Sequence, residues 1–215
     1  MRLPLPLLLT LALAACGSFP RAVGPASDAP EPQRPRVVAF QDAESYRVAL
    51  QVWQTPEDLA AWIGARFDYD RSRALLLSET QRARSGQMAI RSPQEFFASP
   101  SGVCVDLARF AVETLRSIAP DQKANYVMIE FAPVKIAGHT FRLHWLASFE
   151  RDGRLYFFAD SKRPGHIAGP YATTRQFIDE YAEYRGRPVV AFRELGSYQR
   201  TRRALAAKQG REARP

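Results

Sequence analysis

The sequence predicts an α+β fold in which N-terminal helices pack on an antiparallel β-sheet. The first half of the chain carries helix starts and helical apolar spacing, whereas runs of β-branched and aromatic residues begin only after Pro120. Helices followed by strands are typical of this fold class. The roughly 200 residues that follow an N-terminal leader are enough for one domain with its own core.

The N-terminus has the pattern of a secretory signal. Arg2 precedes an apolar run of about 13 residues, which is shorter than the roughly 20 that span a bilayer. The end of this run, Leu13-Ala14-Ala15-Cys16, resembles a bacterial lipobox, in which the cysteine is acylated and becomes the new N-terminus. We therefore expect a signal peptide at 1–15 and a lipid anchor at Cys16, with an ordinary secreted protein as the alternative.

Two segments flank the predicted globular domain at 37–199. Residues 16–36 are rich in Pro, Gly, Ser and Ala, which is typical of a flexible linker. Residues 200–215 are interpreted as a solvated basic tail, with contact to anionic lipid as the alternative. The formal charge of +8 would suit nucleic acid, but an exported location argues against that partner. Gly17 does not resemble the inner-membrane retention signal, so we expect a monomer that faces the periplasm, with the outer membrane favoured.

Short helices are predicted before the main motif. The first covers 42–53, and a second begins at Thr55, with proline at its first position and acids in its first turn. The stretch 68–87 is polar apart from one apolar knot and is predicted to be irregular or short-helical. Residues 92–97 repeat the cap-and-proline pattern of Thr55 and predict another short helix.

The clearest helix covers residues 103–118. Its apolar stripe is Cys104, Ala108, Ala111 and Leu115, and its charged stripe is Asp106, Arg109, Glu113 and Arg116. This pattern predicts Cys104 at the helix N-terminus, pointing into the fold. Strands are then predicted at 126–131, 142–149, 155–159 and 189–192, with a late helix at 173–184.

Cys104 is the only cysteine of the predicted domain, so it has no partner for an intramolecular disulfide. Such a cysteine is either an inert core residue or a reactive thiol. A reactive thiol needs a lowered pKa, which a helix N-terminus and a neighbouring histidine both supply. The backbone N–H of Cys104 is also a candidate oxyanion donor. Trp53, Trp62 and Gln87 are unranked candidates for a second donor.

Three histidines are candidates for holding the thiol proton. His144 is favoured because it lies in a predicted strand beside Trp145, a rigid and shielded position. His139 and His166 lie at a strand entry and in a loop. Asp160 ends the next predicted strand and is the candidate acid that orients the imidazole ring.

The turn between the predicted strands at 142–149 and 155–159 decides whether His144 and Asp160 can meet. A two-residue turn at Asp152-Gly153 would place Asp160 on the opposite face from His144. A three-residue loop at 151–153, or a bulge of the same effect, would place the two side chains directly opposite each other. A triad of Cys104, His144 and Asp160 therefore requires the longer turn or an equivalent irregularity.

Several motifs resemble transglutaminase-like proteins over roughly residues 53–165. They are Ser92-Pro93-Gln94-Glu95-Phe96-Phe97, Ser101-Gly102-Val103-Cys104-Val105-Asp106-Leu107-Ala108, His144-Trp145 and Phe158-Ala159-Asp160-Ser161. The resemblance implies a papain/transglutaminase-like core and thiol-dependent acyl transfer by Cys104, His144 and Asp160. We expect no cofactor and no metal. Many bacterial relatives place an acid beside the cysteine, where this chain has valine, so a calcium-assisted site is not expected.

The function implied by this resemblance is that of a cysteine peptidase or amidase acting on protein or peptide substrates in the cell envelope. A cross-linking transglutaminase would use the same thioester with an amine as acceptor. A catalytically silent lipoprotein serving as a binding or assembly module is the alternative from another class. A basic lipoprotein that acts at anionic surfaces through its tail is a third.

Overall fold

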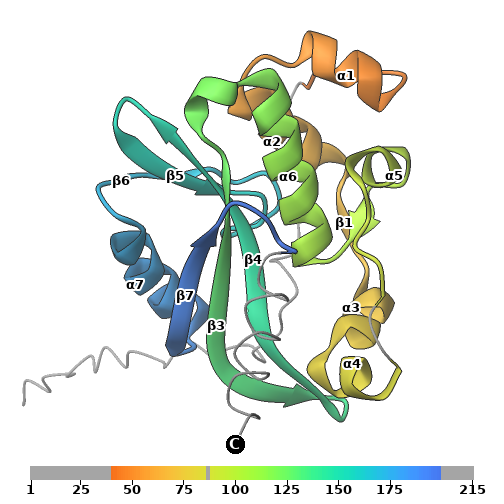
Figure 1. The fold of residues 1–215 in the computed structure, drawn as a ribbon, viewed down its shortest axis with the longest axis vertical. Coiled ribbons are helices and arrows are strands. Elements are labelled where there is room, and N and C mark those ends of the chain that lie inside the picture. The colour runs from red at the N-terminus through yellow and green to blue at the C-terminus, as the bar shows by residue number, and fades with distance from the viewer. Residues whose placement is uncertain (1–39, 86–87, 200–215) are drawn as a thin grey trace, which may run out of the picture.

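A computed structural model describes residues 40–85 and 88–199 (Figure 1). The predicted signal peptide, Cys16, the linker and the basic tail lie outside these residues. The architecture is α+β, with helices packed on a five-stranded antiparallel sheet, which confirms the predicted fold class. Within the described ranges, no helix is both long and apolar enough to cross a bilayer.

The early helices begin where their capping residues predict. The Thr55 and Ser92 side chains each accept an N–H from the residue three positions on, whose carboxylate accepts the cap N–H in return. The first helix begins later than predicted, because Ser45 is its N-cap. The polar stretch after residue 68 contains two short helices. The bounds are α1 Tyr46–Val52, α2 Pro56–Arg66, α3 Arg71–Leu77, α4 Glu79–Ser85 and α5 Pro93–Ala98.

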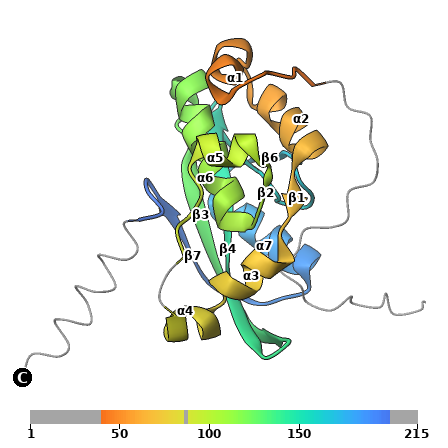
Figure 2. The same cartoon turned by 90° about the vertical axis from the view of Figure 1, so that its right-hand side faces the viewer.

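The predicted central helix is α6, Cys104–Ile118, and α1, α2 and α5 gather around it (Figure 2). Its apolar stripe is buried, with Ala108, Ala111 and Leu115 at 0 % exposure. Aromatic rings of the surrounding helices fill the space between them; they are Trp53, Trp62, Phe96, Phe97 and Phe110. Phe110, on α6 itself, contacts three of these rings and also Tyr46, and truncating a buried aromatic of this kind costs about 3–5 kcal/mol.

The main sheet has the strand order β6–β5–β4–β3–β7. The long hairpin of β3 and β4 extends beyond the predicted strands, and its far end contacts α4. The sequence did not predict β6 or the two-residue parallel pair β1–β2. The bounds are β1 Asp68–Tyr69, β2 Ser101–Gly102, β3 Asn125–Ile136, β4 His139–Arg151, β5 Arg154–Phe158, β6 Ala168–Tyr171 and β7 Val189–Leu195.

Helices cover both faces of this sheet. The helix α6 lies on one face and α7, Thr174–Arg185, lies on the other (Figure 1). Alternate residues of β3 belong to the two separate cores: Tyr126 and Met128 face α6, whereas Val127 and Ile129 face α7. In β4, Trp145 and Ala147 face α6, so their neighbours face α7.

The turn between β4 and β5 is the two-residue form. Arg151 pairs with Arg154, and Asp152 and Gly153 both have positive φ, 52° and 68°. The three-residue loop that the triad was expected to need is therefore wrong. Extended regularly, this register would put Asp160 on the face opposite His144. The regular strand ends at Phe158, however, and the next residue, Ala159, has φ 89°, so the chain changes direction immediately before Asp160.

Candidate functional site

Cys104 is the first residue of α6 and lines a cleft of about 930 Å³. The cleft lies between the start of α6, the segment 88–90 and the outer part of the β3–β4 hairpin, with Tyr198 at its wall. The thiol residue is 7 % exposed, so it lies at the cleft surface without being open to bulk solvent. Met128 and Trp145 give the cleft an apolar floor beside it.

The N-cap of α6 is Val103, which has no polar side chain to accept an N–H from the first turn. A Ser, Thr or Asp at this position would normally accept one of those donors. Only the reverse half of a capping box is present: the Asp106 carboxylate accepts the Val103 N–H at 3.1 Å. The first intrahelical bond is Leu107 N–H to the Val103 carbonyl. Val103 therefore leaves the second and third residues of α6 without the side-chain acceptor that a polar N-cap would supply.

Asp106 fixes the start of α6 against two other segments. Its carboxylate is fully buried and accepts two hydrogen bonds from Arg73 of α3, at 2.6 Å and 2.8 Å. It also accepts the Arg91 N–H at 2.9 Å. With the Val103 contact, all these donors converge on a single buried carboxylate. The residue predicted only as part of a charged stripe is therefore an internal anchor for the helix turn that carries Cys104.

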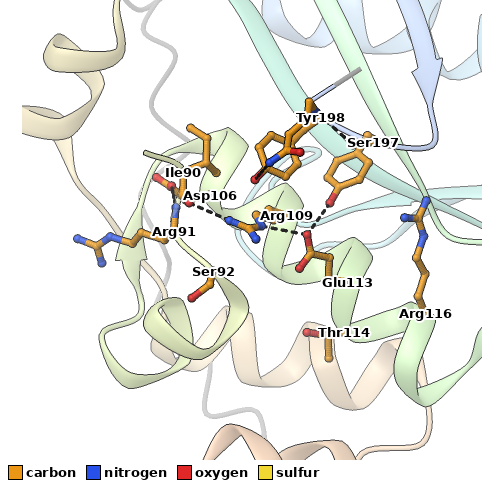
Figure 3. Close-up of polar contacts among 12 residues, drawn as sticks. Ile90, Arg91, Ser92, Asp106, Arg109, Glu113, Thr114, Arg116, Ser197 and Tyr198 are labelled. Atoms are coloured by element: carbon orange, nitrogen blue, oxygen red, sulfur yellow. Dashed lines mark hydrogen bonds and ion pairs between the residues drawn. The ribbon is translucent and has the colours of Figure 1, made fainter. Parts of the chain in front are cut away.

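Arg109, from the charged stripe of α6, lines the cleft beside Cys104, and Figure 3 shows its polar contacts. Arg109 donates to Glu113 at 2.9 Å and to the Ile90 carbonyl at 2.9 Å. The Tyr198 ring lies over its guanidinium at 5.0 Å. These contacts join α6, the segment before α5 and the end of the described chain into one wall.

His144 lies on the α7 face of β4 and is completely buried. Its ring stacks on Tyr181 of α7 at 5.8 Å between centroids and also lies near Phe131. The Tyr181 hydroxyl is 3.0 Å from His144 Nε2, and Arg185 donates to the same hydroxyl at 2.8 Å. The other ring nitrogen, Nδ1, has no hydrogen-bond partner among the described residues.

Asp160 reaches His144 by way of the irregular backbone that follows β5. Its Oδ1 lies 3.5 Å from His144 Nε2, and both side chains are almost fully buried. Gly165 helps to hold this loop: its N–H donates to the Ala159 carbonyl at 2.7 Å, and its φ is 73°. A Cβ at Gly165 would lie 2.1 Å from the Ala60 carbonyl oxygen of α2, so only glycine fits this close approach.

The structure brings His144 and Asp160 together, while Cys104 approaches from the other face of the sheet. Cys104 belongs to the core on the α6 side, whereas the His144 ring packs on the α7 side. The charge of Cys104 nevertheless contributes to raising the pKa of Tyr181, whose hydroxyl contacts His144. Burial is the main cause of the raised pKa of Tyr181, and Cys104 adds only a small contribution.

Burial lowers the pKa of His144 well below its usual range, and the positive charges of Arg185 and Arg187 lower it further. The imidazole is therefore neutral near pH 7. Burial also raises the pKa of Tyr181, so this phenol stays protonated. A neutral imidazole can accept a proton, which is the property that a general base requires.

This pKa shift predicts a pH dependence of stability. Below about pH 6.5 the unfolded chain protonates residue 144 while the folded chain does not, so the unfolded state binds more protons and stability falls with falling pH. We expect His144 to contribute up to roughly 1.4 kcal/mol per pH unit to this loss. Urea unfolding of the wild type and His144→Gln between pH 7.5 and 5 measures it. Equal pH slopes in the two proteins would contradict the shift.

The other candidates from the sequence lie in different environments. His139 is at the far end of β4, where Nδ1 is 2.9 Å from the Ser78 hydroxyl. His166 forms a backbone bridge with Asp160, but its ring contacts the Ser161 hydroxyl at 3.0 Å. None of the three histidines lines the cleft at Cys104, so His144 is distinguished from the other two by its contact with Asp160 and not by its place in the cleft.

The proposed second oxyanion donors are not supported by their surroundings. Trp53 donates its indole N–H to the Gln41 carbonyl at 3.0 Å, and Trp62 is stacked in the aromatic core. Neither tryptophan lines the cleft, so the structure supports neither candidate as the second donor. Gln87 lies outside the described residues. Within the described ranges, no group of three or more His, Cys, Asp or Glu side chains could hold a metal ion.

Comparisons with known proteins add little to this geometry. No family model matches the chain, and no curated protein matches it. Among solved structures, the chain is similar to calcium-bound LapG from Legionella pneumophila, with 18 % identity and a TM-score of 0.34. That match covers 55 % of this chain and 58 % of LapG. A score of this size does not establish a shared fold, so the function is argued from this chain's own residues.

Proposed function

We propose that the protein is a thiol-dependent acyl-transfer enzyme acting on amide bonds, most simply a cysteine peptidase or amidase. Cys104 is the nucleophile, His144 the base and Asp160 the acid that orients the ring. The observation that carries this proposal is that the two ring nitrogens of His144 have different surroundings. Nε2 faces Asp160 and Tyr181, whereas Nδ1 is left without a hydrogen-bond partner among the described residues.

The uncovered part of β4 offers a route by which sulfur and imidazole can meet. The strand β5 pairs with β4 only from Ala147 onward. Within the part of the chain that the structure describes, no strand therefore pairs with His144 on the β5 side of β4. A buried neutral imidazole at that edge can take the thiol proton on Nδ1.

The proposed reaction begins with a proton transfer and proceeds through a thioester on Cys104. The Cys104 proton passes to His144 Nδ1, and the thiolate attacks the amide carbon, forming a C–S bond. The resulting oxyanion accepts a hydrogen bond from the backbone N–H of Cys104 at the start of α6. The imidazolium returns its proton to the departing amine as the C–N bond breaks. Water then gives a proton to His144 and attacks the thioester carbon; the C–S bond breaks, the carboxylic acid leaves, and the proton returns to the Cys104 sulfur. An amine in place of water would instead give a cross-link.

The cleft suits a polypeptide segment better than a small metabolite. Its volume of about 930 Å³ is near the upper end of the range for ligand sites, and its lining mixes an apolar floor with charged walls. Arg142, on the hairpin side, is neutralised by Glu79 and Glu130. Extended chain can cross such a cleft and present one amide carbonyl to Cys104.

A catalytically silent binding module is the second candidate, and one observation favours it. His144 is completely buried on the sheet face away from α6. If the imidazole serves only to pack against Tyr181 and Phe131, the cleft would bind a partner without processing it. Reactivity of Cys104 separates the two functions.

Alkylation by iodoacetamide tests the proposal. With a working Cys–His pair, we expect Cys104 in the full chain to be alkylated quickly, and His144→Ala to slow the reaction by about 100-fold or more, because the proton acceptor is lost. Mass spectrometry locates the modified cysteine, and quenching at timed intervals gives the rate.

His139→Ala is the matched control, since this imidazole contacts Ser78 away from the cleft. It should leave the rate unchanged. Slow alkylation that is indifferent to His144→Ala would instead favour the binding module.

The cellular setting is part of the proposal. A chain anchored at Cys16 would present the domain on the periplasmic side, with the outer membrane favoured, and the substrate would be an envelope protein or peptide. The lipobox resemblance and the linker composition support this placement.

A further inference from the structure

The proposed substrate cleft carries an excess of positive charge. Its charged lining residues are Arg82, Arg109, Arg142, Arg193, Glu79 and Glu130. Both glutamates make ion pairs with the same arginine, Arg142. Arg109 pairs with Glu113, which is not part of the lining. Among the described residues, no ion-pair partner remains for Arg82 and Arg193, so their two positive charges are uncompensated.

The strand pairing places Arg193 in line with the floor of the cleft. Arg193 of β7 lies opposite Met128 of β3, and Met128 lies opposite Trp145 of β4. Directly opposed residues of neighbouring strands point to the same face of a sheet. Two strand spacings put the Cα atom of Arg193 roughly 10 Å from that of Trp145. This exposed arginine therefore shares one row with the two apolar residues beside Cys104.

Arg82 lines the cleft from a different element. It lies on α4, which contacts β4 and whose Glu79 makes the ion pair with Arg142. Arg82 is half-buried. A guanidinium that is partly removed from water and has no carboxylate beside it gains free energy when an anionic group binds it. The cleft thus offers two separate arginines, one on the sheet and one on a helix.

We propose that the cleft selects polypeptide segments that carry Asp or Glu near the amide presented to Cys104, with Arg193 and Arg82 binding those carboxylates. This inference rests on the proposed function and names its substrate class. An extended chain advances about 3.3 Å per residue, so Arg193 meets a side chain about three residues from that amide. Guanidinium groups bind carboxylates with two parallel hydrogen bonds, which gives this contact its specificity.

The composition of the cleft favours an acidic peptide over other charged ligands. A groove for single-stranded nucleic acid presents a row of cations that follows the backbone. This cleft instead combines two uncompensated arginines with an apolar floor of Met128 and Trp145. Uncharged side chains between the acidic ones suit that floor. A basic segment is disfavoured, because both acids of the lining are already paired.

Alkylation of Cys104 by iodoacetate and by iodoacetamide compares an anion with a neutral reagent of similar size. The ratio of the two rates cancels changes in the reactivity of the thiol itself. We expect a higher ratio in the full chain than in N-acetylcysteine. Arg193→Gln should lower it by about two- to fifteenfold, the effect of a unit charge about 10 Å away at dielectric constants between those of water and a protein surface. Arg82→Gln should lower it as well, and salt at about 0.5 M should remove most of the effect.

Arg154→Gln is the matched control for these two variants. Arg154 is exposed on β5, lies outside the cleft and makes no ion pair with a described residue. Its ratio should equal that of the wild type. An unchanged ratio in both Arg193→Gln and Arg82→Gln overturns the inference. A lowered ratio with alkylation that is indifferent to His144→Ala would keep the cleft for acidic ligands and reject the proposed enzyme.

Peptide binding tests the ligand class directly. Three fluorescein-labelled alanine peptides of about ten residues carry Glu, Gln or Lys at every third position, and fluorescence anisotropy measures their binding to Cys104→Ser in the full chain. We expect the Glu peptide to bind about tenfold more tightly than the Gln peptide, with the Lys peptide weakest, and Arg193→Gln to reduce this preference. Equal affinities, or no binding of any peptide, would contradict the inference. Tighter binding of a labelled single-stranded oligonucleotide would overturn it in favour of nucleic acid.

Discussion

Asp160→Asn is expected to slow acylation of Cys104 by roughly 100- to 10,000-fold. The Asp160 carboxylate lies 3.5 Å from His144 Nε2. Because an ionised carboxylate only accepts hydrogen bonds, it favours the tautomer with the proton on Nε2. The amide of asparagine can turn its NH₂ group toward the ring, which would favour the proton on Nδ1 and block transfer from sulfur. The carbon skeleton is nearly the same, so the fold should persist. Burst release of p-nitrophenol from p-nitrophenyl acetate measures the acylation rate without knowledge of the natural substrate.

Asp152→Asn is the control for this measurement. Asp152 lies in the two-residue turn at the other end of β5, with φ 52°, a conformation that asparagine adopts readily. Its acylation rate should match the wild type. A loss of less than about threefold in Asp160→Asn, with both variants folded by circular dichroism, would remove Asp160 from the proposed triad.

Asp106→Ala is expected to lower the free energy of unfolding by about 3–5 kcal/mol. The carboxylate is 0 % exposed, and its removal leaves the largely buried Arg73 guanidinium without its counter-ion. The Val103 and Arg91 N–H groups lose their acceptor at the same time. Guanidinium chloride denaturation measures the change, and Cys104 alkylation in the folded variant reports on the start of α6.

Asp179→Ala provides the comparison, because its ion pair with Arg175 is exposed on α7 at 3.7 Å. Exposed pairs of this type contribute about 0–1 kcal/mol. Similar losses for the two variants would contradict the anchoring role of Asp106. A selective loss at Asp106 would show that the buried network is a principal support of the helix that carries the thiol.

Local chemistry along the chain was sufficient to predict most elements. The caps at Thr55 and Ser92 act on neighbours three residues away, so their helices begin where the sequence indicates. The period of the apolar residues after Cys104 likewise identifies α6. The predicted strands stop short of the outer part of the β3–β4 hairpin, and β6 was not predicted at all. Both depend on pairing partners rather than on their own composition.

The site divides along the same line. The sequence predicted Cys104 at a helix start, His144 in a strand and Asp160 at the end of the next strand. In the structure β5 ends at Phe158, two residues before Asp160. The sequence did not predict why residues 144 and 160 meet. The turn is two residues long, and the backbone changes direction at Ala159, where Gly165 holds the loop against α2. This change of direction brings the carboxylate to the imidazole. No local pattern reports a contact between a loop and a distant helix.

By itself, the sequence determined the fold class, the helix that carries the thiol and the residue types available for acyl transfer, because caps and periodicity act over only a few residues. The tertiary structure alone decided that Asp106 is an internal anchor, that Tyr181 contacts His144 and that Arg185 contacts the Tyr181 hydroxyl. It also decided that the imidazole is buried on the α7 face. Burial and charge at these positions come from segments that are far apart in the chain, and their effects exist only once the sheet and its two helical layers have assembled.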